Sequence, residues 1–451
     1  MKRIAWRMLA LALTLLLLSG AALAEIEIDW DARYTYAELE AQMEAIAATW
    51  PEIAQLYPIG TSVQGRRLWC LELTGPESPG EDRVGIAVLA NIHGGERESA
   101  SSAMYFAWWL ANESQTARVQ AILNKCTVYV APVLNPDGYE QSFIFNTRQN
   151  LRPRDRNGDG TPFSDPYTDI DGDGYIAILY RGTADALPDP GMQPAFGMES
   201  PDWDRNGIPG DDPCNSGVDL NRSFDVPWDC ADLETVQAEG KEADGRSSAT
   251  AIEPEVQAVQ NFLCDNQIDA LATLHSGLQC VLYPWCHRAY DESLDSGEIQ
   301  FMKEVAENMA AALQETTGRG FYAKSSYDDY PTRGELIDFA YGQLNAHAYT
   351  IEVYSGGKSV DGAVSTCKWE DALPEEKWVF YDAEQLAGLG LDVASLMDGA
   401  GVGLKEGEGL WFYTGAAAQM VDRAPEDQGT MVQGCRDALL VMIDSELQGA
   451  G

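Results

Sequence analysis

Apolar residues gather in four short runs that are rich in β-branched side chains, and each run predicts a buried strand. The runs cover residues 84–90, 126–134, 268–274 and 348–353 (VGIAVLA, CTVYVAPVL, IDALATL and AYTIEV). Apolar residues at helical spacing predict helices over 33–50, 101–111, 299–313 and 435–447, and alternation over 56–73 predicts a hairpin. Strands that alternate with helices in this order predict an α/β fold: a mixed, mainly parallel sheet flanked by helices on both faces.

Polar side chains lie near the ends of these strands. The first strand is followed by His93 and Glu96, the third by His275, and the fourth carries Glu352. Because the carboxyl ends of parallel strands share one edge of a sheet, where ligands bind, we expect these residues to converge. An imidazole and a carboxylate three positions apart can bind one metal ion, and a distant second histidine would complete the three protein ligands of catalytic zinc.

Two stretches interrupt this pattern and predict insertions in a single catalytic domain over 25–451. The first, about 153–216, has few apolar residues and many Asp, Gly and Pro, and the second, about 365–425, is rich in Gly, Glu and Asp. Within 155–174, the sequences DRNGDG and DIDGDG begin as calcium loops do, with alternating oxygen ligands and a glycine. Pro166 and Tyr180 occupy the twelfth positions, where such loops carry glutamate, so Ca²⁺ sites and solvated turns both stay open.

The first 24 residues have a different pattern. Three basic residues precede an apolar run over 9–18 and a small-residue cleavage site, which predicts a secretory signal cut before Glu25 and a secreted protein. No later segment reaches the roughly 20 apolar residues of a membrane-spanning helix, so we expect no membrane insertion. A formal charge of −41 argues against nucleic acid and acidic membranes as partners.

Nine cysteines leave at least one thiol unpaired within a monomer. Export permits disulfides, although nine is a low number for 451 residues. The nearest candidate pairs are Cys214 with Cys230 and Cys280 with Cys286.

Six motifs, in one order, resemble the zinc carboxypeptidase family of metallopeptidases, which includes pancreatic carboxypeptidase A. They are HGGE at 93–96, NPDG at 135–138, GVDLNR at 217–222, LHS at 274–276, Tyr330 and TIE at 350–352. The resemblance implies that His93, Glu96 and His275 hold Zn²⁺, with water in the fourth position. It also implies that Glu352 is the general base, which takes a proton from this water and passes it to the leaving amine.

The same resemblance assigns residues to the substrate. Arg148, with Arg152 as the alternative in register, would stabilise the oxyanion that forms from the peptide carbonyl. Asn221 and Arg222 would grip the terminal carboxylate, which would confine cleavage to chain ends because an arginine fork binds a carboxylate bidentately.

Three further positions follow from the resemblance. Asp219 matches an acid that orients a zinc-binding histidine. Tyr330 would cap the terminal carboxylate of the substrate. Ile337 falls where the family sets its side-chain preference, and its apolar side chain suggests an aliphatic or aromatic terminal residue, whereas Asp328 and Asp329 nearby offer a basic side chain a partner.

Together these features predict a secreted zinc metallocarboxypeptidase that acts on the C-termini of peptides or proteins. The first alternative is a bacterial cell-wall peptidase that cleaves peptidoglycan stem peptides with the same site. A second alternative, from a different class, is a catalytically silent binding module; the complete set of ligands, base and carboxylate anchor argues against it. The sequence leaves the oligomeric state open.

Overall fold

A computed structural model describes residues 28–76, 83–144, 147–213, 217–225, 253–290, 297–354, 376–398, 403–415, 419–420 and 428–449. The predicted signal segment, 1–24, lies outside these residues, and so does the candidate pair Cys214 and Cys230. No helix in the described part of the chain is long and apolar enough to cross a membrane.

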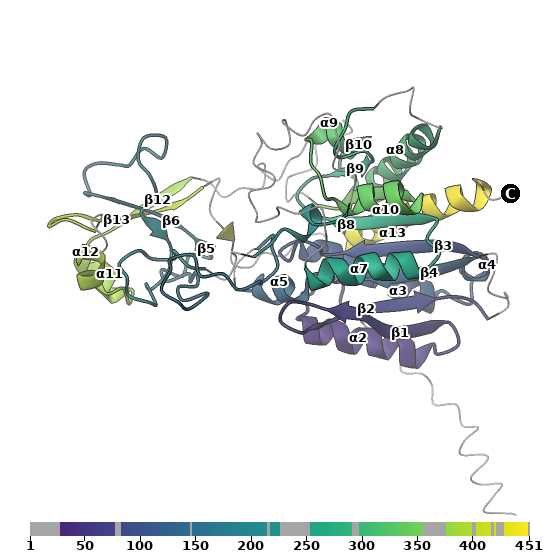
Figure 1. Cartoon of the computed structure of the whole chain (residues 1–451), viewed down its shortest axis with the longest axis horizontal. Coiled ribbons are helices and arrows are strands. Elements are labelled where there is room, and N and C mark those ends of the chain that lie inside the picture. The colour runs from purple at the N-terminus through teal and green to yellow at the C-terminus, as the bar shows by residue number, and fades with distance from the viewer. Residues whose placement is uncertain are drawn as a thin grey trace, which may run out of the picture.

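An eight-stranded sheet forms the centre of the larger part of the molecule (Figure 1). The four predicted strands are adjacent and parallel, whereas the strands Arg67–Leu73 and Cys280–Tyr283 pair antiparallel with their neighbours Cys126–Ala131 and His347–Glu352. The predicted mixed, mainly parallel sheet is therefore confirmed. Its order is β1 (Ala54–Thr61), β2 (Arg67–Leu73), β4 (Cys126–Ala131), β3 (Val84–Ala90), β8 (Ala270–His275), β11 (His347–Glu352), β9 (Cys280–Tyr283) and β10 (Tyr322–Ser325).

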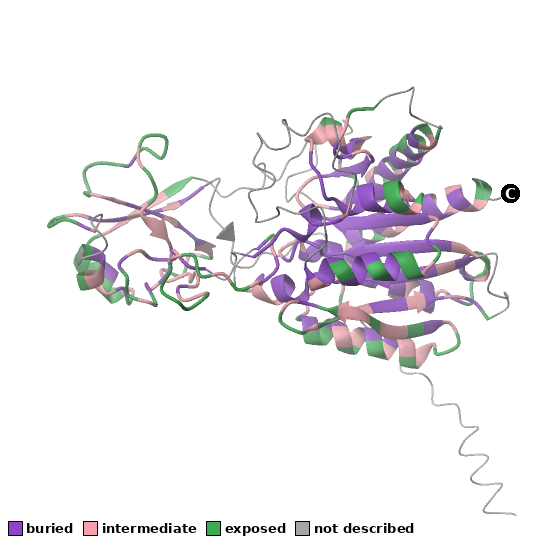
Figure 2. Ribbon diagram, in the orientation of Figure 1, coloured by how far each residue is buried: buried purple, intermediate pink, exposed green. Residues whose placement is uncertain are grey.

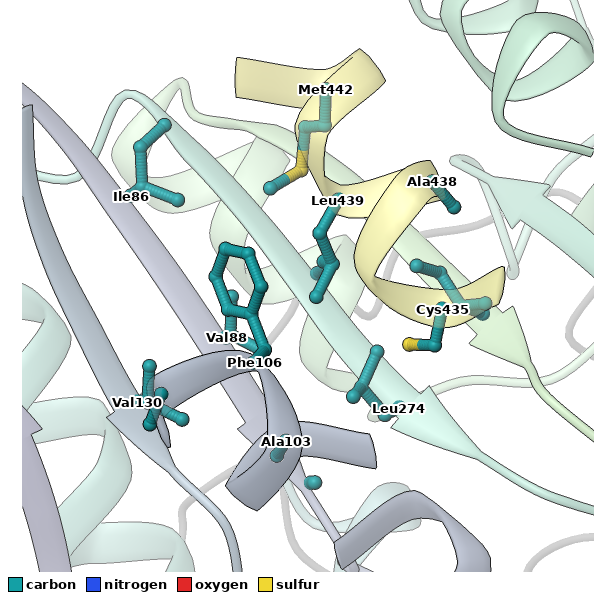
Figure 3. Close-up of a cluster of buried hydrophobic side chains, with 14 of the residues drawn as sticks. Ile86, Val88, Ala103, Phe106, Val130, Leu274, Cys435, Ala438, Leu439 and Met442 are labelled. Atoms are coloured by element: carbon teal, nitrogen blue, oxygen red, sulfur yellow. The ribbon is translucent and has the colours of Figure 1, made fainter. Parts of the chain in front are cut away.

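Helices cover both faces of this sheet, because successive side chains of each central strand point to opposite sides. Ile86 and Val88 pack on one side, and Ala87 and Leu89 on the other. Figure 3 shows part of the first cluster, with Phe106 above the strands, and Figure 2 shows the central strands buried along their length. The first face is covered by α2 (Tyr36–Thr49), α3 (Arg97–Asn112), α8 (Glu298–Thr317) and α13 (Gln428–Gly449), the second by α7 (Pro254–Asp265) and α10 (Leu336–Leu344).

Local sequence signals determine where helices of this domain begin and end. The hydroxyl of Thr35 accepts a hydrogen bond from the backbone N–H of Glu38, whose carboxylate returns to Thr35, so a capping box begins α2. Asn345, in the left-handed region, ends α10 and turns the chain into β11. The shorter connecting helices are α4 (Ala117–Lys125), α5 (Pro136–Gln141), the 3₁₀ turn η1 (Leu220–Arg222) and α9 (Ser326–Asp329).

The two predicted insertions fold together into an accessory lobe, formed by the described residues of 155–213 and 376–415. β6 (Ile178–Gly182) of the first pairs antiparallel with β13 (Gly409–Thr414) of the second. The lobe has its own apolar core, which includes Leu179 and Phe412, and Figure 1 shows it at one end of the molecule, beyond α5. Its other elements are β7 (Gly197–Met198), β12 (Lys377–Tyr381), α11 (Ala383–Gly388) and α12 (Val393–Asp398), and nearby β5 (Tyr175–Ile176) pairs with β14 (Gln419–Met420).

The predicted disulfide between Cys280 and Cys286 is wrong, because both thiols are free and buried. Cys280 begins β9 and Cys286 follows the strand, so the extended backbone between them carries the two sulfur atoms apart. Cys286 instead lies against a carboxylate, with its Sγ 3.4 Å from Oε2 of Glu335.

A histidine at the amino-terminal end of β11 joins three elements. His347 opens β11, with Nδ1 2.8 Å from Glu446 of α13 and Nε2 2.5 Å from Glu298 of α8. Burial alone would lower the pKa of His347, but the hydrogen bonds to the two glutamates raise it above its usual value. The protonated ring can donate to both carboxylates and so ties α8 and α13 to the sheet.

We predict that this interaction makes stability depend on pH. A raised pKa in the folded state contributes stability that is present below the unfolded pKa, near 6.5, and is lost as pH rises through the folded pKa. His347→Gln should therefore lower the melting temperature more at about pH 6 than at about pH 9. Calorimetric melting of both proteins across this range checks it, and an equal difference at all pH values would contradict it.

Candidate active site

The turn after β3 is fixed by one asparagine side chain. Asn91 is fully buried and has a φ of 53°. Its side-chain amide nitrogen lies 3.0–3.1 Å from the carbonyl oxygens of His93, Gly94 and Glu96. A side chain at Gly94 would collide with the backbone of Gly138, so only glycine lets the two turns approach. These contacts hold His93 and Glu96 on the same side of the turn.

The parallel register of β8 and β11 brings two further side chains to this edge. His275 is the last residue of β8, and it pairs directly with Glu352, the last residue of β11. The structure therefore unites four groups that the sequence places up to 259 positions apart, from His93 to Glu352.

Three side chains bring together atoms that could hold a metal ion. Nδ1 of His93 lies 2.8 Å from Glu96 Oε1 and 3.2 Å from Nδ1 of His275, which is 3.0 Å from Glu96 Oε2. Burial alone would raise the pKa of Glu96, but the two histidines lower it. Two imidazole nitrogens and one carboxylate, all within 4.8 Å of one another, match the donor set of a catalytic zinc site.

An aspartate and an arginine support the first histidine. Asp219, at the start of η1, lies 3.2 Å from Nε2 of His93 and accepts a hydrogen bond of 2.6 Å from Nε of Arg148. Burial would raise the pKa of Asp219, but Arg148 and His93 hold it well below its usual range. Arg148 also reaches to 4.0 Å from Glu96, whereas Arg152 pairs with Glu253 at 2.8 Å. Of the two arginines, Arg148 is the one beside the metal-binding atoms.

Glu352 faces the same space without joining the three ligands. Its Oε2 accepts a hydrogen bond of 3.3 Å from the backbone N–H of Leu278. Burial and the nearby charge of Glu96 raise the pKa of Glu352 to about 8. A cation held by Glu96 would lower this pKa and favour the carboxylate form that a general base needs.

The predicted carboxylate anchor lies on the next segment. Nη2 of Arg222 is 3.3 Å from the hydroxyl of Tyr330, and Oδ1 of Asn221 accepts a hydrogen bond from the backbone N–H of Leu336 at 3.0 Å. Asn221, Arg222 and Tyr330 are therefore together. Ile337 is fully buried in the second apolar cluster, so its role in side-chain preference stays a prediction.

Comparisons with known proteins agree with this geometry. A sequence profile of the zinc carboxypeptidase family matches residues 39–366. The chain belongs to the zinc carboxypeptidase family. The matched range contains every residue of the candidate site, from Asn91 to Glu352.

Individual members of the zinc carboxypeptidase family are distant from this chain. Zinc carboxypeptidase A 1 of Anopheles gambiae is 25% identical over 346 residues, which are 74% of this chain and 63% of that protein. Carboxypeptidase B of Astacus astacus is 24% identical, and the match covers 73% of this chain and 89% of that protein. Mouse carboxypeptidase D is 36% identical, and the match covers 26% of this chain and 10% of that protein. The chain thus spans less than two thirds of the length of the mosquito and mouse relatives.

A solved structure shows the same fold. Carboxypeptidase A from Helicoverpa armigera superposes with a TM-score of 0.52 and 17% identity, and the match covers 84% of this chain and 79% of the insect chain. At this identity the likeness supports the architecture of the zinc carboxypeptidase fold and not a substrate.

Two residues of this zinc carboxypeptidase site are absent from the sequence-based prediction. Asn91 has no recognisable pattern, because its contacts depend on a left-handed backbone. Glu335, which pairs with Arg222 at 3.0 Å, ends the sequence Thr-Arg-Gly-Glu just before α10. That sequence resembles a capping box, which indicates a local structural role and hides the long-range ion pair.

A third acidic loop in the accessory lobe is also absent from the prediction. The sequence DWDRNG at 202–207 repeats the spacing of the two predicted calcium loops. Asp204 and Asp211 here gather with Asp165, and Glu199 joins Asp169 and Asp171 of the second loop. A search for the same spacing would have found the third loop, but not Glu199, which comes from outside the loop it meets.

We predict that Asn91 controls how firmly this zinc carboxypeptidase site holds its metal. Asn91→Asp keeps the shape and tolerates the left-handed backbone, but it replaces the amide donor with an oxygen that faces three carbonyl groups. Residues that support metal ligands typically contribute 10- to 100-fold in affinity, so zinc should dissociate at least about tenfold faster. Zinc release to a coloured chelator measures this rate.

The matched control is Asn112→Asp, at the far end of α3, which should leave zinc release unchanged. Circular dichroism establishes that both variants are folded. An unchanged rate for folded Asn91→Asp would show that the amide does not support the metal-binding turn.

Proposed function

We propose that this protein is a secreted zinc metallocarboxypeptidase that hydrolyses the C-terminal peptide bond of peptides or proteins. The observation that carries the proposal is the convergence of three ligand side chains, a nearby carboxylate and a buried arginine at one edge of the sheet. Secretion is supported by the sequence of the first 24 residues. The charge of −41 argues against nucleic acid as a partner.

The site residues divide the chemistry between them. Zinc, when bound, lowers the pKa of a water molecule from 15.7 to roughly 7 and polarises the peptide carbonyl. Glu352 accepts the proton of the attacking water and delivers it to the amine that leaves. Arg148 carries a positive charge beside the metal-binding residues, where it can stabilise negative charge on the carbonyl oxygen. Asp219 holds both Arg148 and His93 in place.

Recognition of a chain end is assigned to Arg222, Asn221 and Tyr330. Arg222 and Asn221 would bind the terminal carboxylate by charge-assisted hydrogen bonds, and Tyr330 would close over it. The main chain of a peptide carries a carboxylate only at its C-terminal end. A buried arginine that must bind this carboxylate therefore excludes cleavage of internal peptide bonds. This geometry favours an exopeptidase.

A cell-wall peptidase is the alternative with the same site, because stem peptides also end in free carboxylates that Arg222 could bind. The two functions separate by product. Release of a free amino acid from blocked dipeptides supports the carboxypeptidase, and loss of a stem-peptide bond in muropeptides without dipeptide cleavage supports the alternative. Zinc binding with neither reaction would leave the silent binding module.

We also propose that the acidic loops of the accessory lobe bind Ca²⁺. Oxygen atoms from Asp169, Asp171 and Glu199 lie within 4.8 Å of one another, and so do those of Asp155, Asp159 and Asp212. Glu199 supplies a glutamate oxygen beside a loop whose own twelfth position lacks one. Burial raises the pKa of Glu199 to about 8, a cost that a bound cation would remove.

We predict that Arg222→Ala acts on free chain ends only. The KM for blocked dipeptides with a free carboxylate should rise on the order of 100-fold, because the buried arginine is the partner of that carboxylate, while amidated substrates change little. Steady-state kinetics on both substrates gives the two ratios. Arg152→Ala, which removes an arginine that pairs elsewhere, is the control and should resemble the wild type. Equal effects of Arg222→Ala on both substrates would indicate an endopeptidase.

The calcium proposal predicts heat and stabilisation on titration of metal-stripped protein. A ligand that binds only the folded state raises its stability, so excess Ca²⁺ should raise the melting temperature by a few degrees. Asp171→Asn, which weakens one group of ligands, should reduce both effects. Absence of heat and of any melting shift in the wild type would reject the calcium sites.

A further inference from the structure

The predicted carboxylate anchor already has a carboxylate partner inside the protein. Nη1 of Arg222 donates to Oε1 of Glu335 at 3.0 Å and to the carbonyl of Asn221 at 2.8 Å. The side chains of Arg222 and Glu335 are only 5% and 8% exposed. A substrate carboxylate that binds Arg222 must therefore share this arginine with Glu335.

Glu335 is held in this position by several contacts. The hydroxyl of Thr332 donates to its Oε1 at 2.5 Å, and the thiol of Cys286 lies 3.4 Å from its Oε2. Gly334, with a φ of 75°, lies so close to Arg222 that a side chain there would meet its backbone at 2.5 Å. The loop before α10 is thus built against the arginine, and Glu335 cannot turn away when a second carboxylate arrives.

Two other acids of the same segment pair with residues other than Arg222. Asp338 lies 2.5 Å from Nδ1 of His287, and Asp329 lies 2.6 Å from Nζ of Lys324. Glu335 differs because its partner is the residue that the substrate itself engages. Substrate binding therefore leaves its charge only partly compensated, at a side chain that is only 8% exposed.

We propose that Glu335 selects terminal residues that carry a cationic side chain, such as lysine or arginine. The proposal rests on the carboxypeptidase function given above. The side chain of a terminal residue starts one bond from the Cα that bears the carboxylate, so it lies beside whatever surrounds Arg222. An ammonium or guanidinium group there pairs with Glu335 and balances the two carboxylates that share one arginine. A neutral side chain leaves one buried negative charge in excess. The proposed cationic preference therefore differs from the apolar preference expected from Ile337.

The test compares blocked dipeptides that end in Lys, Arg, Leu and Phe. The wild type should have a kcat/KM at least about tenfold higher for the cationic pair, and Glu335→Gln should reduce this ratio by about tenfold or more. The glutamine keeps a hydrogen bond to Arg222, so the loss arises mainly in the KM of the cationic substrates. Asp328→Asn, which removes an exposed acid near Tyr330, is the matched control and should keep the wild-type ratio.

A purely structural role for Glu335 gives a different result. If the residue only positions Arg222, Glu335→Gln changes the KM of all four substrates alike and the ratio stays constant, which overturns the proposal. A wild-type preference for Leu or Phe overturns it as well. Glu335→Asp, which keeps the charge, should retain part of the cationic preference.

Binding measurements decide the proposal even if no dipeptide is hydrolysed. N-acetyl-lysine and N-acetyl-leucine are titrated by calorimetry into zinc-loaded Glu352→Gln protein, with and without Glu335→Gln. Tighter binding of the lysine compound that disappears with Glu335→Gln supports selection by Glu335, and equal binding of both compounds rejects it. Failure of hydrolysis alone would reject the proposed enzyme and leave this result intact.

Discussion

Buried charge at the carboxyl ends of the central parallel strands is the constraint on which the rest of the structure depends. Two histidines and two glutamates lie together there: His93 and His275 are buried, and Glu96 and Glu352 are partly buried beside them. Ionised groups in such a place are stable only when each has an opposite charge or a hydrogen bond. Asn91 and the parallel register of β8 and β11 supply the positions, and a divalent cation would supply the missing positive charge.

The same principle orders the substrate side of the site. The buried Asp219 is balanced by Arg148, and the buried Arg222 by Glu335, so neither Asp219 nor Arg222 stands as an isolated buried charge. Each pair ties together segments that are far apart in sequence. A ligand that adds one carboxylate changes this balance, and the way the protein restores it determines which ligands it accepts. Specificity in this site is therefore a matter of charge compensation as much as of shape.

The predictable parts of the molecule are those that depend on local pattern. β3 and β8 are recognisable because strands buried on both faces are apolar without interruption, and their ends mark the metal-binding residues. The accessory lobe could not be predicted, because β6 and β13 are short and pair across more than 200 residues of sequence. The spacing of Cys280 and Cys286 suggested a bond, but spacing says nothing of the strand that separates them. Glu335 was hidden for a related reason, since its sequence context indicates a helix start.

The most direct test of this account measures zinc content and turnover together in Glu352→Gln. The account assigns three ligands to the metal and the proton transfer to Glu352, so the two properties should separate. Mass spectrometry should find one zinc ion per chain at the catalytic site in both proteins, while the variant hydrolyses blocked dipeptides at less than about one hundredth of the wild-type rate. A variant that retains wild-type turnover, or a wild type that binds no zinc at this site, would contradict the account.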